Sequence, residues 1–206
     1  MNFINLISLL IGYLIGSFSP SYFIGKLLRG IDIREYGDGN AGGTNVYYVL
    51  GLKPAILVAF IDLSKGLISM YLAYKFGVSN LFIHLAGLSA IAGHVFPFYL
   101  SFRGGKGIGT GMGILFYYFY VLISNKWLPY YMFLLYLLFI ALVYFITRRK
   151  EILGIIALPT LLALILIFAP FNLVTIFSGI IIIYIFIMNF ALNILNLWKR
   201  DTAQQI

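Results

Sequence analysis

Two glycine-rich turns are the segments of this chain whose residue types and spacing could do chemistry. The first runs from Gly37 to Asn45 with the sequence GDGNAGGTN, and the second is Gly104-Gly105-Lys106-Gly107. Glycines let consecutive peptide N–H groups line one concave surface, and a helix that follows such a turn adds the positive end of its dipole. The pattern therefore predicts two phosphate-binding nests at one membrane surface. Each should open a long apolar helix, and together they favour a substrate with more than one anionic group.

Composition determines the class of protein. Of 206 residues, 62% are hydrophobic and only 10% are charged, which is too apolar for a soluble domain and predicts an integral membrane protein. Cysteine is absent and there are two histidines, so thiol catalysis, disulfides and a histidine-rich metal site are excluded. The first segment lacks a basic leader and a small-residue cleavage site, so we expect a retained transmembrane helix. With no soluble basic face, the net charge of +8 does not favour nucleic-acid binding.

Continuous apolar runs predict an all-α bundle of seven transmembrane helices, because strands of a barrel would alternate in polarity. We expect one polytopic membrane domain over residues 1–206. The fourth and sixth runs are the shortest. The predicted spans are Phe3 to Ile24, Ala55 to Tyr74, Leu81 to Phe102, Ile108 to Ser124, Leu128 to Ile146, Ile152 to Phe168 and Leu173 to Leu197.

Basic residues between and after the spans predict the orientation. Seven crossings leave Lys75 and Lys126 on one side and ten basic residues on the other, which the positive-inside rule makes cytoplasmic. The N-terminus is then periplasmic, the C-terminus is cytoplasmic, and both glycine turns face the cytoplasm. The ten are Lys26, Arg29, Arg34, Arg103, Lys106, Arg148, Arg149, Lys150, Lys199 and Arg200.

Asp62, Lys65 and His94 are ionisable residues inside the predicted spans, where charge is costly. Asp62 and Lys65 lie three positions apart on one helix face, so they can neutralise each other. They form either a structural ion pair or one wall of a substrate site. His94 precedes Pro97 near the second glycine turn, which favours a functional role over simple packing. The pairs Gly12/Gly16 and Gly109/Gly113 are typical of close helix packing.

These residues, taken in order, resemble the motifs of the acyl-phosphate glycerol-3-phosphate acyltransferase family, PlsY. The resemblance covers about Gly16 to Thr110. Asn193-Ile194 is similar to the C-terminal motif of the family. The matching segments are Gly16-Ser17 with Pro20, Asp32-Ile33-Arg34, Gly37 to Asn45, Asp62 to Gly66, Gly93-His94, and Gly104 to Gly107 with Thr110.

The resemblance implies a seven-helix bacterial inner-membrane enzyme of phospholipid biosynthesis that uses no metal or other cofactor. Such an enzyme moves a fatty acyl group from acyl phosphate to the 1-hydroxyl of glycerol 3-phosphate, giving lysophosphatidic acid and phosphate. Its implied partners are these two substrates and membrane lipid. The catalytic residues would be His94, Lys106 and Asn193, which line the acceptor pocket. The substrate-binding residues would be Asp38, Gly39, Asn40, Gly42, Gly43, Thr44, Asn45, Asp62, Lys65, Gly104, Gly105 and Gly107.

Within this resemblance, Thr44 and Asn45 with the flanking backbone would hold the donor phosphate, and that phosphate would take the hydroxyl proton. Because acyl phosphate is already activated, no protein nucleophile is required. Two acceptor-phosphate positions depart from the family, with Asp38 in place of serine and Tyr48 in place of arginine. Two alternatives therefore stay open: a paralogue with another polar acceptor, and a non-catalytic phosphate- or lipid-binding membrane protein.

Overall fold

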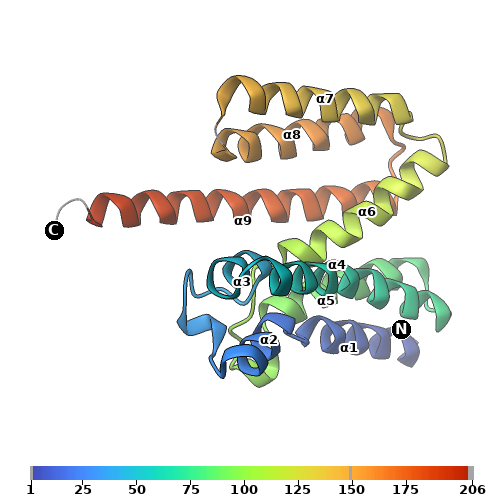
Figure 1. Cartoon of the computed structure of the whole chain (residues 1–206). Coiled ribbons are helices and arrows are strands. Elements are labelled where there is room, and N and C mark those ends of the chain that lie inside the picture. The colour runs from blue at the N-terminus through green and yellow to red at the C-terminus, as the bar shows by residue number, and fades with distance from the viewer. Residues whose placement is uncertain (1, 149, 204–206) are drawn as a thin grey trace. The chain divides into compact units, whose positions relative to one another are not determined.

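The computed structural model describes the backbone of residues 2–148 and 150–203 and the side chains of residues 2–148 and 155–190. The regular elements in these ranges are helices, and they fall into two compact units, residues 1–117 and residues 118–206. The helices labelled in Figure 1 are α1 (Phe3–Ser17), α2 (Pro20–Arg29), α3 (Gly43–Leu50), α4 (Leu52–Lys75), α5 (Asn80–Val95), α6 (Ile108–Ser124), α7 (Tyr130–Thr147), α8 (Lys150–Phe168) and α9 (Leu173–Ala203). Two short 3₁₀ turns, Ile33–Glu35 and Phe98–Leu100, lie between them.

The membrane-spanning segments agree with the apolar runs of the sequence. Within the described residues, five segments are long and apolar enough to cross a bilayer. They are Phe3–Arg29, Leu52–Lys75, Asn80–Leu100, Tyr130–Thr147 and Leu173–Phe190. The two remaining apolar helices, Ile108–Ser124 and Ile155–Phe168, are shorter, and they are the fourth and sixth runs. The protein is an all-helical, multi-pass integral membrane protein.

The first predicted span is broken, so its prediction as one helix from Phe3 to Ile24 was wrong. α1 ends at Ser17, and α2 begins at Pro20, whose ring has no N–H to continue the helix. The carbonyl groups at the break need donors inside the membrane. Lys65 Nζ donates to the carbonyl oxygens of Gly16 at 3.2 Å and Phe18 at 3.0 Å. The Lys65 side chain, which belongs to α4, thus supplies hydrogen-bond donors to the carbonyl groups that the break leaves unpaired.

The sequence predicted that the first glycine turn opens a long apolar helix, and this prediction was wrong. It opens α3, which has only eight residues and ends at Leu50, just before Gly51, where φ is +95°. α4 then begins at Leu52. The second turn does open a long helix, α6. The third predicted span, Leu81 to Phe102, corresponds to the apolar segment Asn80–Leu100, within which α5 ends at Val95, two residues before Pro97.

Small residues bring α1 and α5 into close contact in the first unit, as the Gly12/Gly16 spacing predicted. A Cβ on Gly12 would lie 2.5 Å from the carbonyl oxygen of Ala86, and one on Gly16 would collide with that of Ala90. In the same way Gly113 of α6 lies against the Leu63 carbonyl of α4. α4 packs against both α1 and α5, and the three helices run side by side (Figure 1).

We expect Gly16→Ala to destabilise the protein, because its methyl group must push two helix backbones apart. Overpacking of this kind costs about 1–3 kcal/mol. Gly179→Ala in α9 is the matched control, since its Cβ would meet only Leu162 Cδ1 at 3.4 Å. That control should be neutral or stabilising by up to about 1 kcal/mol through helix propensity. Thermal unfolding in detergent measures both variants, and equal melting temperatures would contradict the packing argument.

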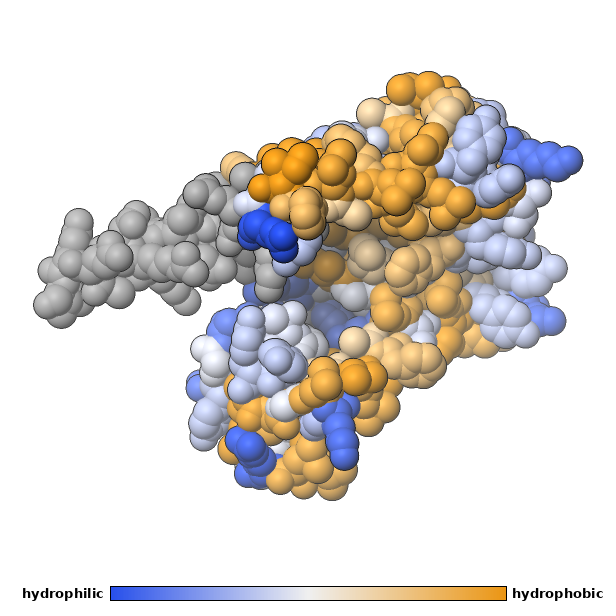
Figure 2. Space-filling view, turned by 45° about the horizontal axis from the view of Figure 1, so that its top comes forward, coloured by the Kyte–Doolittle hydropathy of each residue, from blue (hydrophilic) through white to orange (hydrophobic). Residues whose placement is uncertain are grey.

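The second unit consists of the end of α6 and the helices α7, α8 and α9. α8 packs against α9 through Leu161 and Ile165 on one side and Phe177 and Ile181 on the other, all of which are buried. Large apolar side chains cover much of the surface of both units, as the orange areas of Figure 2 show. Apolar surfaces of this size are favourable in contact with lipid and unfavourable in contact with water.

Candidate functional site

The two glycine turns meet in the first unit. The peptide at Gly105 lies so close to Ala41 that a Cβ on Gly105 would sit 2.7 Å from the Ala41 carbonyl oxygen. Lys106 Nζ lies 3.6 Å from Asp38 Oδ2, and the two side chains are 28% and 41% exposed. Residues nearly 70 positions apart in the sequence therefore form one glycine-lined junction that carries an accessible ammonium group.

Arg34 connects the segments that carry these turns. Its guanidinium group donates to the carbonyl oxygens of Leu100 at 2.8 Å and Arg103 at 3.1 Å, just before the second turn. Its other edge pairs with the Asp32 carboxylate, with Nη2 2.7 Å from Oδ2. The hydrogen bond from Arg34 lowers the pKa of Asp32 below its ordinary value. The sequence motif Asp32-Ile33-Arg34 included Arg34, but this bridging role was not predicted from it. The Asp-x-Arg spacing in a loop is the feature of the sequence that could have indicated the role.

Asn45 is fully buried and organises the first turn. Its amide nitrogen lies 2.9 Å from the carbonyl oxygens of Ile33 and Tyr36 and 3.0 Å from that of Asn40. Its Oδ1 atom accepts from the peptide N–H of Asp38 at 2.9 Å. The polar atoms of this side chain are thus engaged by the loop, which assigns Asn45 a role in shaping the turn.

Several N–H groups of the expected nests are already used. Asp38 N–H donates to Asn45, Gly39 N–H to the Tyr36 carbonyl, and Asn40 N–H to Asp38 Oδ1. Gly104 and Gly105 donate to the carbonyl groups of Val95 and His94. These N–H groups are therefore engaged within the turns themselves, and the substrate-binding role expected of these residues stays a prediction.

The N–H groups suited to an anion lie instead at the beginnings of the helices. The first turn of an α-helix has no intrahelical acceptors for its N–H groups. These positions are Gly43, Thr44 and Asn45 in α3, and Ile108 and Gly109 in α6. Each helix also directs the positive end of its dipole toward its own glycine turn.

Asp62, Lys65 and His94 form a buried cluster beneath the second turn. Each residue is less than 7% exposed. Lys65 Nζ lies 2.8 Å from Asp62 Oδ1 and 2.7 Å from His94 Nδ1. The opposite edge of the His94 ring lies against Gly105. The predicted ion pair within α4 is therefore present, and it extends to the predicted site histidine on α5.

Thr110, in the first turn of α6, is a polar residue to which the sequence assigned no role. Its side chain is fully buried, and its hydroxyl group makes no hydrogen bond within the part of the chain that the structure describes. Thr44 and Tyr48 are both exposed and share one face of α3. Asn193, the third predicted catalytic residue, has a side chain that lies outside the described residues.

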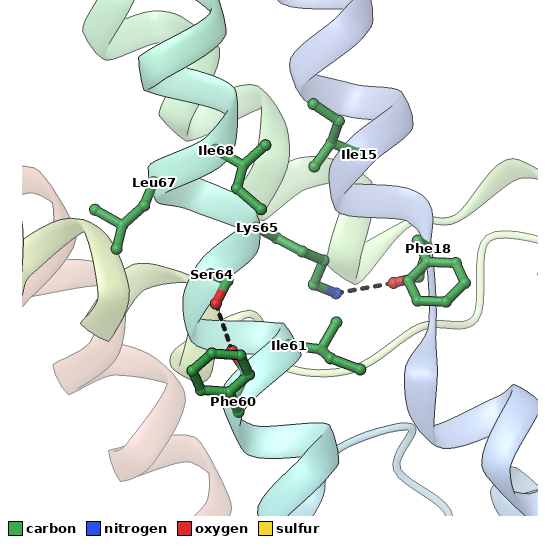
Figure 3. Close-up of a pocket in the computed structure, with 8 residues that line it drawn as sticks. All are labelled: Ile15, Phe18, Phe60, Ile61, Ser64, Lys65, Leu67 and Ile68. Carbon is green, nitrogen blue, oxygen red and sulfur yellow. Dashed lines mark hydrogen bonds between the residues drawn. The ribbon is translucent and has the colours of Figure 1, made fainter.

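An apolar groove runs between α1 and α4 and reaches the buried cluster. Its volume is about 680 Å³. Figure 3 shows Lys65 extending across it toward the carbonyl group of Phe18, while Ser64 donates to the Phe60 carbonyl oxygen at 2.8 Å. The lining residues are Ile15, Phe18, Phe60, Ile61, Ser64, Lys65, Leu67 and Ile68. A groove with apolar walls and one buried ammonium group suits an elongated hydrocarbon with a polar end.

The fold and this junction define a multi-pass helical membrane protein with a basic, glycine-rich site where two helices begin. Residues 6–200 match the glycerol-3-phosphate acyltransferase family, and the chain belongs to that family. The resemblance drawn from the sequence motifs is thereby confirmed.

Curated relatives agree with this assignment. The chain is 46% identical over 109 residues to a glycerol-3-phosphate acyltransferase of Parasynechococcus marenigrum, covering 53% of this chain and 51% of the relative. It is 49% identical over 110 residues to that of Shouchella clausii, covering 52% and 54%. The matched region thus spans about half the length of these relatives.

Solved structures match over a longer stretch. A crystal structure of PlsY, an integral membrane glycerol 3-phosphate acyltransferase in its glycerol 3-phosphate form, is 31% identical with a TM-score of 0.69. The match covers 95% of this chain and 92% of that protein. The lysophosphatidic acid form of PlsY is 30% identical with a TM-score of 0.67 and the same coverage.

Proposed function

We propose that this protein transfers a fatty acyl group from acyl phosphate to the 1-hydroxyl of glycerol 3-phosphate, releasing lysophosphatidic acid and inorganic phosphate. The observation that carries the proposal is the meeting of the two glycine turns, where Lys106 of the second turn lies 3.6 Å from Asp38 of the first. Membership of the acyltransferase family supports it, as does the likeness to PlsY in its glycerol 3-phosphate form. One polytopic domain over residues 1–206 accords with a family match that spans residues from both compact units.

Two phosphate groups would be held by different parts of the junction. The N-terminus of α3, with Thr44 exposed beside it, suits the phosphate of the acyl donor. Lys106 and the N-terminus of α6 suit the phosphate of the acceptor, since an ammonium group is a strong partner for a phosphate dianion. His94, whose ring lies against Gly105, completes the part of the proposed acceptor pocket that the first unit supplies. The remaining predicted residues shape the turns or lie beneath them.

The groove between α1 and α4 suits the fatty acyl chain. Its apolar walls would cover the hydrocarbon, and Lys65 lies between this groove and His94. The acyl carbonyl group would then lie near the glycine junction, where the glycerol hydroxyl oxygen attacks it. The bond between the acyl carbon and the phosphate oxygen breaks, and the departing phosphate takes the hydroxyl proton. Orientation and charge stabilisation supply the catalysis in this scheme.

Release of inorganic phosphate from synthetic acyl phosphate tests the proposal. The purified protein should release phosphate and form lysophosphatidic acid in equal amounts when glycerol 3-phosphate is present. Phosphate release only with a different acceptor would identify a paralogue. The absence of turnover with every acceptor, despite binding of acyl phosphate, would identify a binding protein and overturn the proposal.

One observation favours the alternative of a different acceptor. Asp38 places a carboxylate 3.6 Å from Lys106, at the position where an acceptor phosphate would need that ammonium group. A less anionic acceptor would not have to compete with this carboxylate. The phosphate-release assay should therefore include glycerol beside glycerol 3-phosphate.

We also propose that the glycine junction faces the cytoplasm and that the protein lies in the inner membrane with its N-terminus periplasmic. The distribution of basic residues along the sequence supports this orientation.

Single cysteines can test this orientation on the cysteine-free chain. Tyr36→Cys and Arg103→Cys should react only from the cytoplasmic side, and Ser79→Cys and Asn125→Cys only from the periplasmic side. Arg103 serves in place of Gly104, because a Cβ on Gly104 would collide with the His94 carbonyl group. Labelling of Tyr36→Cys and Arg103→Cys from opposite sides would exclude a shared site.

A further inference from the structure

The buried cluster of Asp62, Lys65 and His94 restricts where the protons of His94 can be. Lys65 Nζ lies 2.7 Å from His94 Nδ1, 2.8 Å from Asp62 Oδ1 and 3.0 Å from the Phe18 carbonyl oxygen. An ammonium group has only donors, so His94 Nδ1 can only accept from it at this distance. His94 Nδ1 therefore carries no hydrogen when Lys65 is charged.

The charge balance of the cluster agrees with this assignment. One ammonium and one carboxylate neutralise each other in a site that is almost closed to water. Protonating His94 on both nitrogens would place a second cation 2.7 Å from Lys65, facing the same carboxylate. A buried, uncompensated charge is strongly unfavourable. A ring that carries its single hydrogen on Nε2 fits this arrangement.

The Nε2 edge of the ring faces the meeting point of the two turns. A Cβ on Gly105 would collide with His94 Nε2 and would also lie 2.7 Å from the Ala41 carbonyl oxygen. The backbone of Gly105 therefore packs between the imidazole and the first turn, one residue before Lys106.

We propose that Lys65 and Asp62 fix His94 as its Nε2–H tautomer, and that His94 donates a hydrogen bond from Nε2 to a phosphate oxygen of a substrate held between the two glycine turns. His94 is then a donor that stabilises negative charge, and it does not act as a general base. Lys65 and Asp62 are positioning residues that act through His94. The inferred hydrogen bond from His94 to a substrate phosphate rests on the proposed function. The inferred Nε2–H tautomer does not.

Two substitutions of His94 distinguish a role as hydrogen-bond donor from a role as general base. The amide of His94→Gln can donate from nearly the same place as Nε2 but cannot take a proton, whereas His94→Ala does neither. A hydrogen bond to a charged group is worth roughly 1.5–3 kcal/mol, so His94→Ala should lose about tenfold or more in kcat. His94→Gln should recover most of that loss. Equal losses in the two variants, with both folded, would overturn the donor role.

The tautomer can be observed without any turnover. ¹⁵N-histidine NMR of the unaltered protein in nanodiscs should show His94 with a protonated Nε2 and an unprotonated Nδ1. The chain has only two histidines, so His84→Gln and His94→Gln assign the signals. Addition of glycerol 3-phosphate should shift the Nε2 signal. A doubly protonated ring or an Nδ1–H tautomer would overturn the assignment even if the enzyme is active. An Nε2 signal that does not move at saturating ligand would overturn the donor role alone.

Lys65→Met supplies the test of the positioning role. Removal of the ammonium group leaves Nδ1 without its donor, so we expect His94 to populate both tautomers. The kcat should fall while the KM for acyl phosphate changes little. If Lys65→Met does not fold, the NMR measurement on the unaltered protein still decides the tautomer. A folded Lys65→Met protein that keeps the Nε2–H tautomer and full kcat would show that Lys65 does not act through His94.

Discussion

Lys106→Ala should lower the turnover of acyl transfer by about tenfold or more, because a charge-assisted hydrogen bond to phosphate is worth roughly 1.5–3 kcal/mol. The ammonium group lies where the two glycine turns meet, and no backbone N–H group can replace its full charge. The loss of folded protein should be small, since the pair that Lys106 forms with Asp38 is partly exposed and such pairs contribute about 0–1 kcal/mol. Steady-state kinetics and detergent melting curves measure the two effects separately.

Lys53→Ala is the matched control for this experiment. Lys53 is an exposed lysine at the beginning of α4, outside the junction, so its loss should leave turnover unchanged. If purified Lys106→Ala and His94→Ala proteins both keep full acyl transfer, the assignment of the site to this junction is wrong.

The double change Asp38→Ser with Tyr48→Arg should lower the KM for glycerol 3-phosphate by about tenfold or more, which corresponds to roughly 1.4 kcal/mol. Asp38 Oδ2 faces Lys106 at 3.6 Å and competes with a phosphate for that ammonium group. Tyr48 is 72% exposed on α3 and stands at a position where the family resemblance implies an arginine for the acceptor phosphate, so Tyr48→Arg would supply that planar cation. The unaltered protein should accordingly saturate only weakly with glycerol 3-phosphate.

Asp38→Asn isolates the effect of charge. Asp38 Oδ1 accepts a hydrogen bond from the Asn40 N–H at 3.0 Å, and an asparagine can keep this bond while losing the negative charge. We expect Asp38→Asn to improve the KM for glycerol 3-phosphate and to leave the KM for glycerol unchanged. If the unaltered protein already saturates at low glycerol 3-phosphate, and both variants are neutral or harmful, the altered-acceptor alternative should be dropped.

The sequence by itself determined the membrane class, the family and, apart from the break after Ser17, the approximate positions of the apolar helices. Each depends on local properties. Long apolar runs must become helices in lipid, because their peptide groups find no water to bond. The glycine spacings also predicted close packing correctly, since only small residues allow backbones to approach as α1 and α5 do.

The tertiary structure decided how the polar groups are used. The break at Phe18 depends on Lys65, which is 47 positions away along the chain, and the first turn depends on Asn45 to hold its carbonyl groups. Sequence motifs identify glycines that free peptide N–H groups, but hydrogen-bond partners from elsewhere in the fold determine which of those groups remain for a ligand. For the same reason His94 was recognisable as a polar residue near a turn, while its 2.7 Å contact with the Lys65 ammonium group arises only from helix packing.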